Sequence, residues 1–361
     1  MTTGQRVMVR QWGETPLQTL KDHVNLQTMA RPTSLEPDEI LLRVRSCAVG
    51  WVDLIMMSGQ YQHQVQPPYT PGIEFAGEVA AIGAAVTDHR VGDRVLADGF
   101  RTGPRSDGPH QRWGGFATWS VLRADAAFPL PDTLSFDQAV NLLGNYETAY
   151  HVLRARGQLQ PGETVIVLGA SGSTGLAGVR LAKQLGATVI AVGRTQTKLD
   201  RVAELGADHV LTPGEGERWL RDAVRDITGG QGADVVWDGV GGPISIHALR
   251  ALRFGGRFCI VGWAATPFVA RGKGQRGAPN ANQLPTNLVQ MKGIDVLGCP
   301  AVIATLHDPS LRPHRLAWIW DQVRNGTLRP HAGPGYALGD FNDALRAKWS
   351  SQHVGGCVLH P

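Results

Sequence analysis

The residues best suited to chemistry lie in a turn of small side chains at 169–175, Gly-Ala-Ser-Gly-Ser-Thr-Gly. An apolar run at 164–168 precedes the turn, and apolar residues at helical spacing follow it as far as Leu185. In such a strand, turn and helix, backbone N–H groups and the positive end of the helix dipole converge where small residues let an anion approach. We therefore predict a pyrophosphate site. Its expected contacts are Ala170, Ser171, Gly172, Ser173 and Thr174.

The glycine pattern is incomplete, because Ala170 stands at the first position of G-x-G-x-x-G. A glycine-rich turn without a ligand is therefore the alternative. A second strand at 187–192 favours the ligand, since it completes a βαβ unit and ends where the ribose of a dinucleotide is recognised.

The residues after this second strand distinguish NAD from NADP. An NAD site places Asp or Glu there to accept a hydrogen bond from the ribose 2′-hydroxyl. This chain instead has Gly193, Arg194, Thr195 and Lys198. Two cations and no acid favour a 2′-phosphate, so NADP(H) is the expected cofactor. Alternatively, Arg194 and Lys198 are solvated residues at the start of a surface helix.

From about residue 133 strands alternate with helices, which is typical of an α/β, doubly wound parallel (Rossmann) sheet. We expect its strands at 164–168, 187–192, 208–212, 233–238, 257–261 and 294–298. Ligands of such sheets lie beyond the carboxyl ends of the strands. Those ends add Asp238, Val240, Gly262 and Trp263 to the expected cofactor contacts.

Residues 1–132 contain short strands separated by turn residues, which predicts a β-rich, barrel-like domain. The polar, Gly- and Pro-containing segment 98–113 is expected to be a surface loop. A last strand at 357–359 is expected to return to this domain.

Composition limits the function. The chain is 42% hydrophobic and 18% charged, as in an ordinary globular protein, and its net charge of +4 comes from scattered cations, which argues against nucleic-acid binding. Its 4 cysteines are far apart, which argues against a disulfide framework and favours a cytoplasmic setting. No apolar stretch is long enough to span a membrane, and the first residues lack the apolar core of a signal peptide. A small-molecule substrate is expected.

Several longer stretches resemble a known family: PGIEFAGEV at 71–79, the segment 160–194, VVWDGVGG at 235–242 and GTLRPHAG at 326–333. With them the chain resembles the medium-chain dehydrogenase/reductase superfamily, in its zinc-independent quinone oxidoreductase-like branch. The resemblance implies a GroES-like β-barrel catalytic domain of residues 1–132 and 328–361 and an NADP(H)-binding Rossmann domain of residues 133–327. It also implies a homodimer that pairs sheet edges near 294–298.

The zinc ligands of the zinc-dependent relatives are absent from the matching positions. Gly50 replaces the cysteine three residues before Asp53, Ile73 replaces the histidine of Gly-His-Glu, and no cysteine occurs in 141–146. Without such donors we expect no catalytic zinc. The histidines His63, His89 and His110 show no ligand spacing and are expected at the surface.

Zinc acts as a Lewis acid that polarises a simple carbonyl. Without it, the substrate must be easier to reduce than a simple ketone. A quinone or an α,β-unsaturated carbonyl is therefore expected as hydride acceptor. The expected pocket residues, for each of which core packing is the alternative, are Trp51, Ile55, Met56, Met57 and Trp263.

The proton donor is the open point, because Ile55 stands where some relatives carry a tyrosine. Tyr146 is the candidate, and Asn145 and Thr148 on the same helix are expected to contact cofactor or substrate.

Two other functions stay open. One is an enoyl-thioester (enoyl-CoA) reductase, in which Arg271, Lys273 and Arg276 of the segment 264–287 hold carrier phosphates. The other is a catalytically silent nucleotide-binding redox sensor or adaptor.

Overall fold

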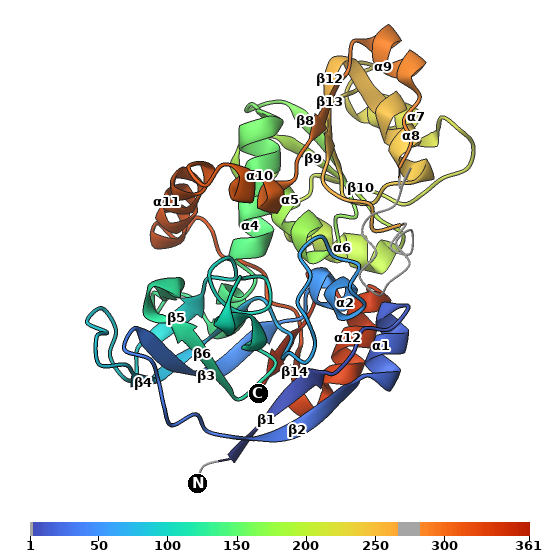
Figure 1. Cartoon of the computed structure of the whole chain (residues 1–361). Coiled ribbons are helices and arrows are strands. Elements are labelled where there is room, and N and C mark those ends of the chain that lie inside the picture. The colour runs from blue at the N-terminus through green and yellow to red at the C-terminus, as the bar shows by residue number, and fades with distance from the viewer. Residues whose placement is uncertain (1–2, 266–281) are drawn as a thin grey trace. The chain divides into compact units, whose positions relative to one another are not determined.

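The structure is a computed structural model that describes residues 3–265 and 282–361 (Figure 1). The predicted cations of the segment 271–276 lie outside the described residues. The chain divides into two compact units, of which the first comprises 3–143 and 329–361 and the second 144–265 and 282–328.

Residues 133–143, expected in the Rossmann domain, belong to the first unit. The reason is α3 (Phe136–Ala139), which packs on β3 (Glu39–Ala48) and β4 (Phe75–Ile82) of that unit. Asp137 in this helix also lies 2.9 Å from Nε2 of His360 at the other end of the chain.

The first unit is built on a seven-stranded, mainly antiparallel sheet in the order β14-β15-β3-β4-β5-β7, with β6 also paired to β3. The other strands of the unit are β5 (Arg94–Ala97), β6 (Trp119–Arg123), β7 (Ala127–Pro129), β14 (Gly335–Ala337), β15 (Val358–His360) and the separate pair β1 (Thr3–Val9) and β2 (Val24–Ala30). The predicted return of the last strand is confirmed, because β15 pairs with β3. The sheet fits the expected GroES-like architecture.

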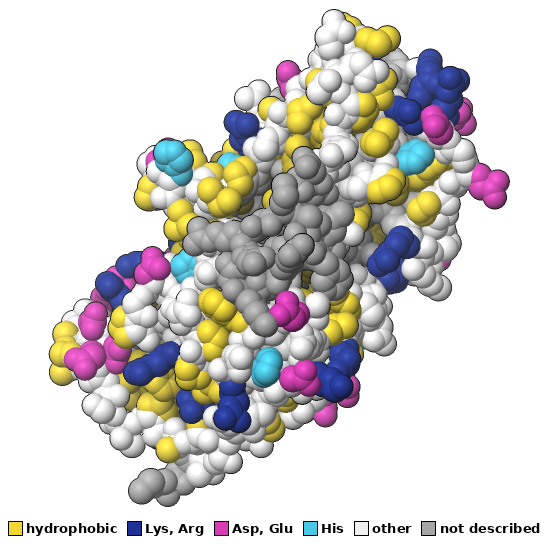
Figure 2. Space-filling model, turned by 45° about the vertical axis from the view of Figure 1, so that its right-hand side comes forward, with side chains coloured by type: hydrophobic (Ala, Val, Ile, Leu, Met, Phe, Trp, Pro, Cys, Tyr) yellow, Lys and Arg dark blue, Asp and Glu magenta, His cyan; other side chains and the backbone are white. Residues whose placement is uncertain are grey.

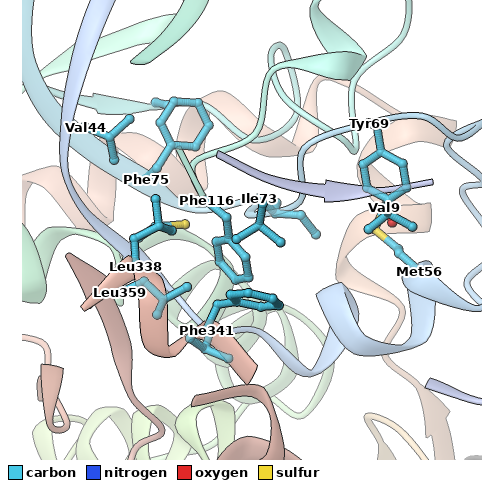
Figure 3. Packing of buried hydrophobic residues seen from close by; sticks show 14 of the residues in the cluster. Val9, Val44, Met56, Tyr69, Ile73, Phe75, Phe116, Leu338, Phe341 and Leu359 are labelled. Carbon is cyan, nitrogen blue, oxygen red and sulfur yellow. The ribbon is translucent and has the colours of Figure 1, made fainter. Parts of the chain in front are cut away.

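Three helices of the first unit pack side by side (Figure 1): α1 (Pro16–Asp22), α2 (Trp51–Met57) and α12 (Phe341–Trp349), of which α12 also contacts β14 and β15. Aromatic and aliphatic side chains fill the interior, among them Phe75, Phe116 and Phe341 (Figure 3). Met56 and Tyr69 belong to the same core.

Two expectations for the first unit are wrong. In the segment 98–113, Asp98, Thr102 and Ser106 are buried, so the segment is not simply a surface loop. His89 and His110 are buried as well, because their rings have polar partners: Nε2 of His110 is 2.8 Å from Oε1 of Glu39, and Nε2 of His89 is 3.0 Å from the carbonyl oxygen of Ala124.

The second unit contains a six-stranded parallel sheet in the order β10-β9-β8-β11-β12-β13. Its strands are β8 (Thr164–Leu168), β9 (Thr188–Val192), β10 (His209–Leu211), β11 (Ala233–Asp238), β12 (Leu252–Ile260) and β13 (Asp295–Gly298). Counted within the unit, this is the order 3-2-1-4-5-6 of dinucleotide-binding sheets, which confirms the doubly wound prediction. The order reverses between β8 and β11.

The helices of the second unit connect and cover these strands. They are α4 (Leu143–Tyr150), continued by a π-helix (His151–Arg156), α5 (Ser173–Gln184), α6 (Gln196–Glu204), α7 (Trp219–Ile227), α8 (Pro243–Ala251), α9 (Thr286–Lys292), α10 (Ala301–His307) and α11 (Leu311–Arg324). Val165, Ile166 and Val167 of β8 are fully buried, as expected of a central strand covered on both faces.

On the face shown in Figure 2, hydrophobic side chains are interspersed with charged ones. Phe254 and Met291 of the second unit are among the large apolar residues that remain exposed. Within 3–265 and 282–361, no helix combines the length and apolar character needed to cross a membrane.

Candidate functional site

The turn after β8 has the geometry of an anion site. Gly169 adopts a φ of +71°, and α5 begins at Ser173 with Gly172 as an N-cap that supplies no side-chain hydrogen bond. As a glycine, Gly172 offers the first N–H groups of α5 no capping side chain of its own. At Gly175 a Cβ would lie 2.3 Å from the carbonyl oxygen of Gly169, so only glycine lets the helix start this close to the turn. A pyrophosphate fits here.

Asp238 organises the neighbouring turn after β11. Its side chain is fully buried, and Oδ1 accepts hydrogen bonds from the N–H groups of Val240 (3.0 Å) and Gly241 (2.9 Å). Oδ2 accepts from the hydroxyl of Ser245. This network places Val240 next to Gly169, since a Cβ on Gly169 would lie 3.0 Å from Cγ2 of Val240. Asp238 thus shapes the site, and its direct contact with a cofactor stays a prediction.

The chain after β12 joins the same edge of the sheet. The N–H groups of Val261 and Gly262 point to the carbonyl oxygen of Asp238 at 2.8 and 3.2 Å. Trp263 follows with 48% of its surface exposed. The structure thus brings the predicted residues Val240, Gly262 and Trp263 to the carboxyl ends of β11 and β12.

Two cations lie at the end of β9. Arg194 is exposed and Lys198 is half-buried on the first turn of α6. Burial lowers the pKa of Lys198, and the positive charge of Arg194 lowers it further. Thr195 is the N-cap of α6. A phosphate dianion would relieve the repulsion between the two cations.

The helix α4 contributes Asn145, whose Oδ1 accepts a hydrogen bond of 3.0 Å from the hydroxyl of Thr174. Asn145 therefore lies at the turn after β8, and its contact with cofactor or substrate stays a prediction. Tyr146 is only 3% exposed, and its hydroxyl pairs with Arg180. Burial raises the pKa of this phenol. The hydroxyl of Thr148 donates to the carbonyl oxygen of Gly144 at 2.7 Å, so both side chains have partners within the unit.

A buried ion-pair network joins α4 to α11. The sequence did not predict it. Arg312 and Arg315 of α11 both pair with the carboxylate of Glu147, at 2.9 and 2.8 Å. Nη2 of Arg315 also donates to the hydroxyl of Thr305 at 2.6 Å. His151 lies nearby, and burial together with the charges of Arg315 and Arg156 lowers its pKa to about 4. The network fixes α4 against α10 and α11.

In the first unit, Asp53 of α2 contacts the positions that match zinc ligands of zinc-dependent relatives, which are Gly50 just before α2 and Ile73 just before β4. Asp53 is buried, and it accepts N–H hydrogen bonds from Gly50 (3.0 Å), Gly72 (3.0 Å) and Ile73 (3.2 Å). Burial raises its pKa to about 6 although these donors oppose the shift. A Cβ on Gly50 would lie 2.6 Å from Oδ2 of Asp53, so a cysteine there would displace this carboxylate. Outside residues 1–2 and 266–281, no three His, Cys, Asp or Glu side chains form a group that could hold a metal ion.

The predicted pocket residues of α2 differ in their surroundings. The ring of Trp51 stacks on that of Trp349 at 5.0 Å between centroids with only 4° between planes. Trp51 and Ile55 are half-buried. Met56 and Met57 are buried in the core, which favours the packing role for these two.

Comparisons with known proteins agree with this geometry. Residues 36–132 match the model of the alcohol dehydrogenase GroES-like domain, and residues 173–307 match that of the zinc-binding dehydrogenases. The chain is 31% identical over 329 residues to a quinone oxidoreductase-like protein 2 homolog of Nematostella vectensis, covering 91% of this chain and 83% of the relative. The chain therefore belongs to the medium-chain dehydrogenase/reductase family, in its quinone oxidoreductase-like branch.

Solved structures of similar fold include a probable oxidoreductase from Mycobacterium abscessus, with a TM-score of 0.79, 28% identity and coverage of 100% of this chain and 99% of that one. A quinone oxidoreductase from Thermus thermophilus, also solved as its complex with NADPH, has a TM-score of 0.74 at 24% identity, with coverage of 99% of this chain and 100% of that one. At that identity the second likeness shows the fold alone.

Proposed function

We propose that this chain is an oxidoreductase that uses NADPH to reduce a quinone or an α,β-unsaturated carbonyl without zinc. The observation that carries the proposal is the glycine-rich turn with Gly172 as N-cap of α5, together with the cations Arg194 and Lys198 at the end of the next strand. The cofactor is NADP(H), and when bound it supplies a hydride from its nicotinamide ring.

The residues of the second unit have distinct roles in this proposal. The turn 169–174 holds the pyrophosphate, and Arg194 and Lys198 hold the 2′-phosphate. Asn145 keeps Thr174 in place through their 3.0 Å hydrogen bond. Trp263, exposed beyond β12, covers the nicotinamide end.

Zinc independence is supported by the side chains at the matching positions. Gly50 and Ile73 offer no metal ligand, and Asp53 is occupied by three backbone N–H groups. A conjugated acceptor needs less activation than a simple ketone, so that orientation and exclusion of water can suffice.

We also propose a cytoplasmic location.

The test is NADPH consumption by the purified protein across quinones, enals, enones, enoyl-CoA esters and simple ketones, with metal analysis of the same preparation. We expect turnover of quinones or enones, preference for NADPH over NADH, and no change after treatment with a chelator. Bound zinc at one equivalent together with loss of activity on chelation would contradict the zinc-free mechanism. Preferred turnover of crotonyl-CoA would indicate an enoyl-thioester reductase, and NADPH binding without any turnover would indicate a sensor or adaptor.

A further inference from the structure

Asn282, which precedes α9, contacts the turn that follows β11. Its Oδ1 accepts a hydrogen bond of 3.1 Å from the N–H of Gly242, the N-cap of α8. Its Nδ2 donates to the hydroxyl oxygen of Ser245 at 3.2 Å and to Oδ2 of Asp238 at 3.4 Å. This one half-buried side chain therefore joins the end of β11 to the first turn of α8.

The three contacts require an amide side chain. A backbone N–H can only donate, so the amide oxygen of Asn282 has to face Gly242. A carboxylate oxygen can only accept, so the amide nitrogen has to face Asp238. An aliphatic residue at this position would remove one partner from each of these groups. An acidic residue would keep the acceptor for Gly242 but would place a second negative charge beside Asp238.

The turn 239–242 depends on such outside contacts for its position. Its sequence is Gly-Val-Gly-Gly, and glycine leaves the backbone free to adopt many conformations. At Gly241, whose φ is +74°, a Cβ would lie 3.0 Å from Cβ of Trp263 and 3.8 Å from Cγ of Asn282. The side chains of Trp263 and Asn282 therefore both pack on this turn.

The same turn borders the place where the sheet order reverses. The reversal lies between β8 and β11, and ligands of doubly wound sheets bind beyond the strand ends at this point. The turn 169–174 follows β8, and the turn 239–242 follows β11. Val240 and Gly169 bring the two turns together, because a Cβ on Gly169 would lie 3.0 Å from Cγ2 of Val240. A shift of the turn 239–242 would therefore change the shape of the nucleotide site.

We propose that Asn282 is a positioning residue for the NADP(H) site. It fixes the turn 239–242 in the conformation that borders the nucleotide, and it acts through this turn rather than by contact with the reacting atoms. A turn that is ordered before the nucleotide arrives lowers the entropic cost of binding. This role rests on the proposed function and adds a residue to its cofactor site.

Asn282→Ala tests this role. The variant is expected to bind NADP+ about tenfold more weakly, as for the loss of hydrogen bonds that order the site, and the KM for NADPH is expected to rise more than kcat falls. Calorimetry measures the dissociation constant separately from the fraction of protein able to bind, and misfolding lowers only that fraction. Asn325→Ala is the matched control, because Nδ2 of Asn325 donates to the carboxylate of Asp321 at the end of α11.

Asn282→Asp gives a signature that a loss of stability would not produce. Of the hydrogen-bond partners of Asn282 in the described parts of the chain, Asp238 is the titratable one. Its negative charge raises the pKa of the new carboxyl group. Protonation of that group restores a donor toward Asp238, so the affinity of this variant for NADP+, relative to the wild type, is expected to rise as the pH falls from 8 to 6. Asn325→Asp is expected to show a constant ratio.

Wild-type affinity for NADP+ in Asn282→Ala would overturn the role of Asn282 while leaving the proposed function intact. The same conclusion would follow if Asn325→Ala weakened binding equally, or if the relative affinity of Asn282→Asp did not change with pH. If the wild-type protein binds neither NADP+ nor NADPH, the proposed function and the role of Asn282 both fail.

Discussion

At the level of single residues, we expect Arg194 and Lys198 to determine which dinucleotide the chain prefers. A charge-assisted contact to phosphate contributes about 1.5–3 kcal/mol. We expect Arg194→Ala to raise the KM for NADPH about 10- to 100-fold while the KM for NADH changes little. Steady-state kinetics with both nucleotides measure the ratio of the KM for NADPH to the KM for NADH. Arg201→Ala is the control, because this exposed arginine of the same helix pairs with Glu204 instead.

An unchanged ratio of the two KM values in Arg194→Ala would contradict the role of these cations. Replacing Gly193 with an acid is a less clean test, since a Cβ there would lie 3.0 Å from Cδ2 of Leu199. The loss of affinity would then combine charge repulsion with a shift of α6.

The sequence alone could not predict the contacts of residues whose partners lie far away along the chain. Glu147 pairs with Arg312 and Arg315, which lie more than 160 positions further along the chain. The residues next to Glu147 in the sequence do not predict this pairing. His110 meets Glu39 in the same way, which is why its expected exposure was wrong.

At the level of elements, the strands of the parallel sheet follow from the sequence because each is a short apolar run bounded by turn residues. β12 is the exception at its start: Leu252 lies far ahead of the predicted 257–261, since the Gly-Gly pair at 255–256 resembles a strand boundary. The helix α2 was missed because its seven residues are too few to show a period. α1 was missed although Thr15 and Pro16 form a recognisable start, with Thr15 capping the N–H of Gln18.

The packing of α4 and its π-helical extension against α11 predicts an acid-sensitive second unit. His151 has a pKa of about 4 in the fold, below its ordinary value of 6.5. The folded state therefore keeps His151 neutral while the unfolded chain binds a proton, and stability present above pH 6.5 is lost as the pH falls through 4. One such group changes the free energy of unfolding by at most about 1.4 kcal/mol per pH unit.

Denaturant titrations between pH 7 and pH 4 measure this effect. We expect His151→Gln to show a smaller loss of stability over this range than the wild-type protein. His314→Gln, which changes an exposed histidine of α11, is expected to behave like the wild type. If the free energy of unfolding depends on pH equally in His151→Gln and in the wild type, His151 is not the group that couples stability to pH.

For the whole molecule, the free edge of the parallel sheet supports a homodimer. β13 pairs with β12 on one side, and within the described parts of the chain no strand pairs with its other side. Val296 of β13 is 40% exposed, and the nearby Met291 is 68% exposed. An apolar strand edge of this kind tends to pair with another copy. We therefore propose that two copies join through β13.

Charge placed on this edge tests the dimer. Val296→Lys is expected to give a monomer with an unchanged fold, because the side chain is already exposed and lysine opposes edge pairing. Light scattering coupled to size exclusion reports the mass, and circular dichroism reports the fold. His209→Lys places the same residue on β10, the opposite edge of the sheet, and is expected to leave the dimer intact. A monomeric wild-type protein, or a dimer that persists in Val296→Lys but dissociates in His209→Lys, would show that β13 is not the interface.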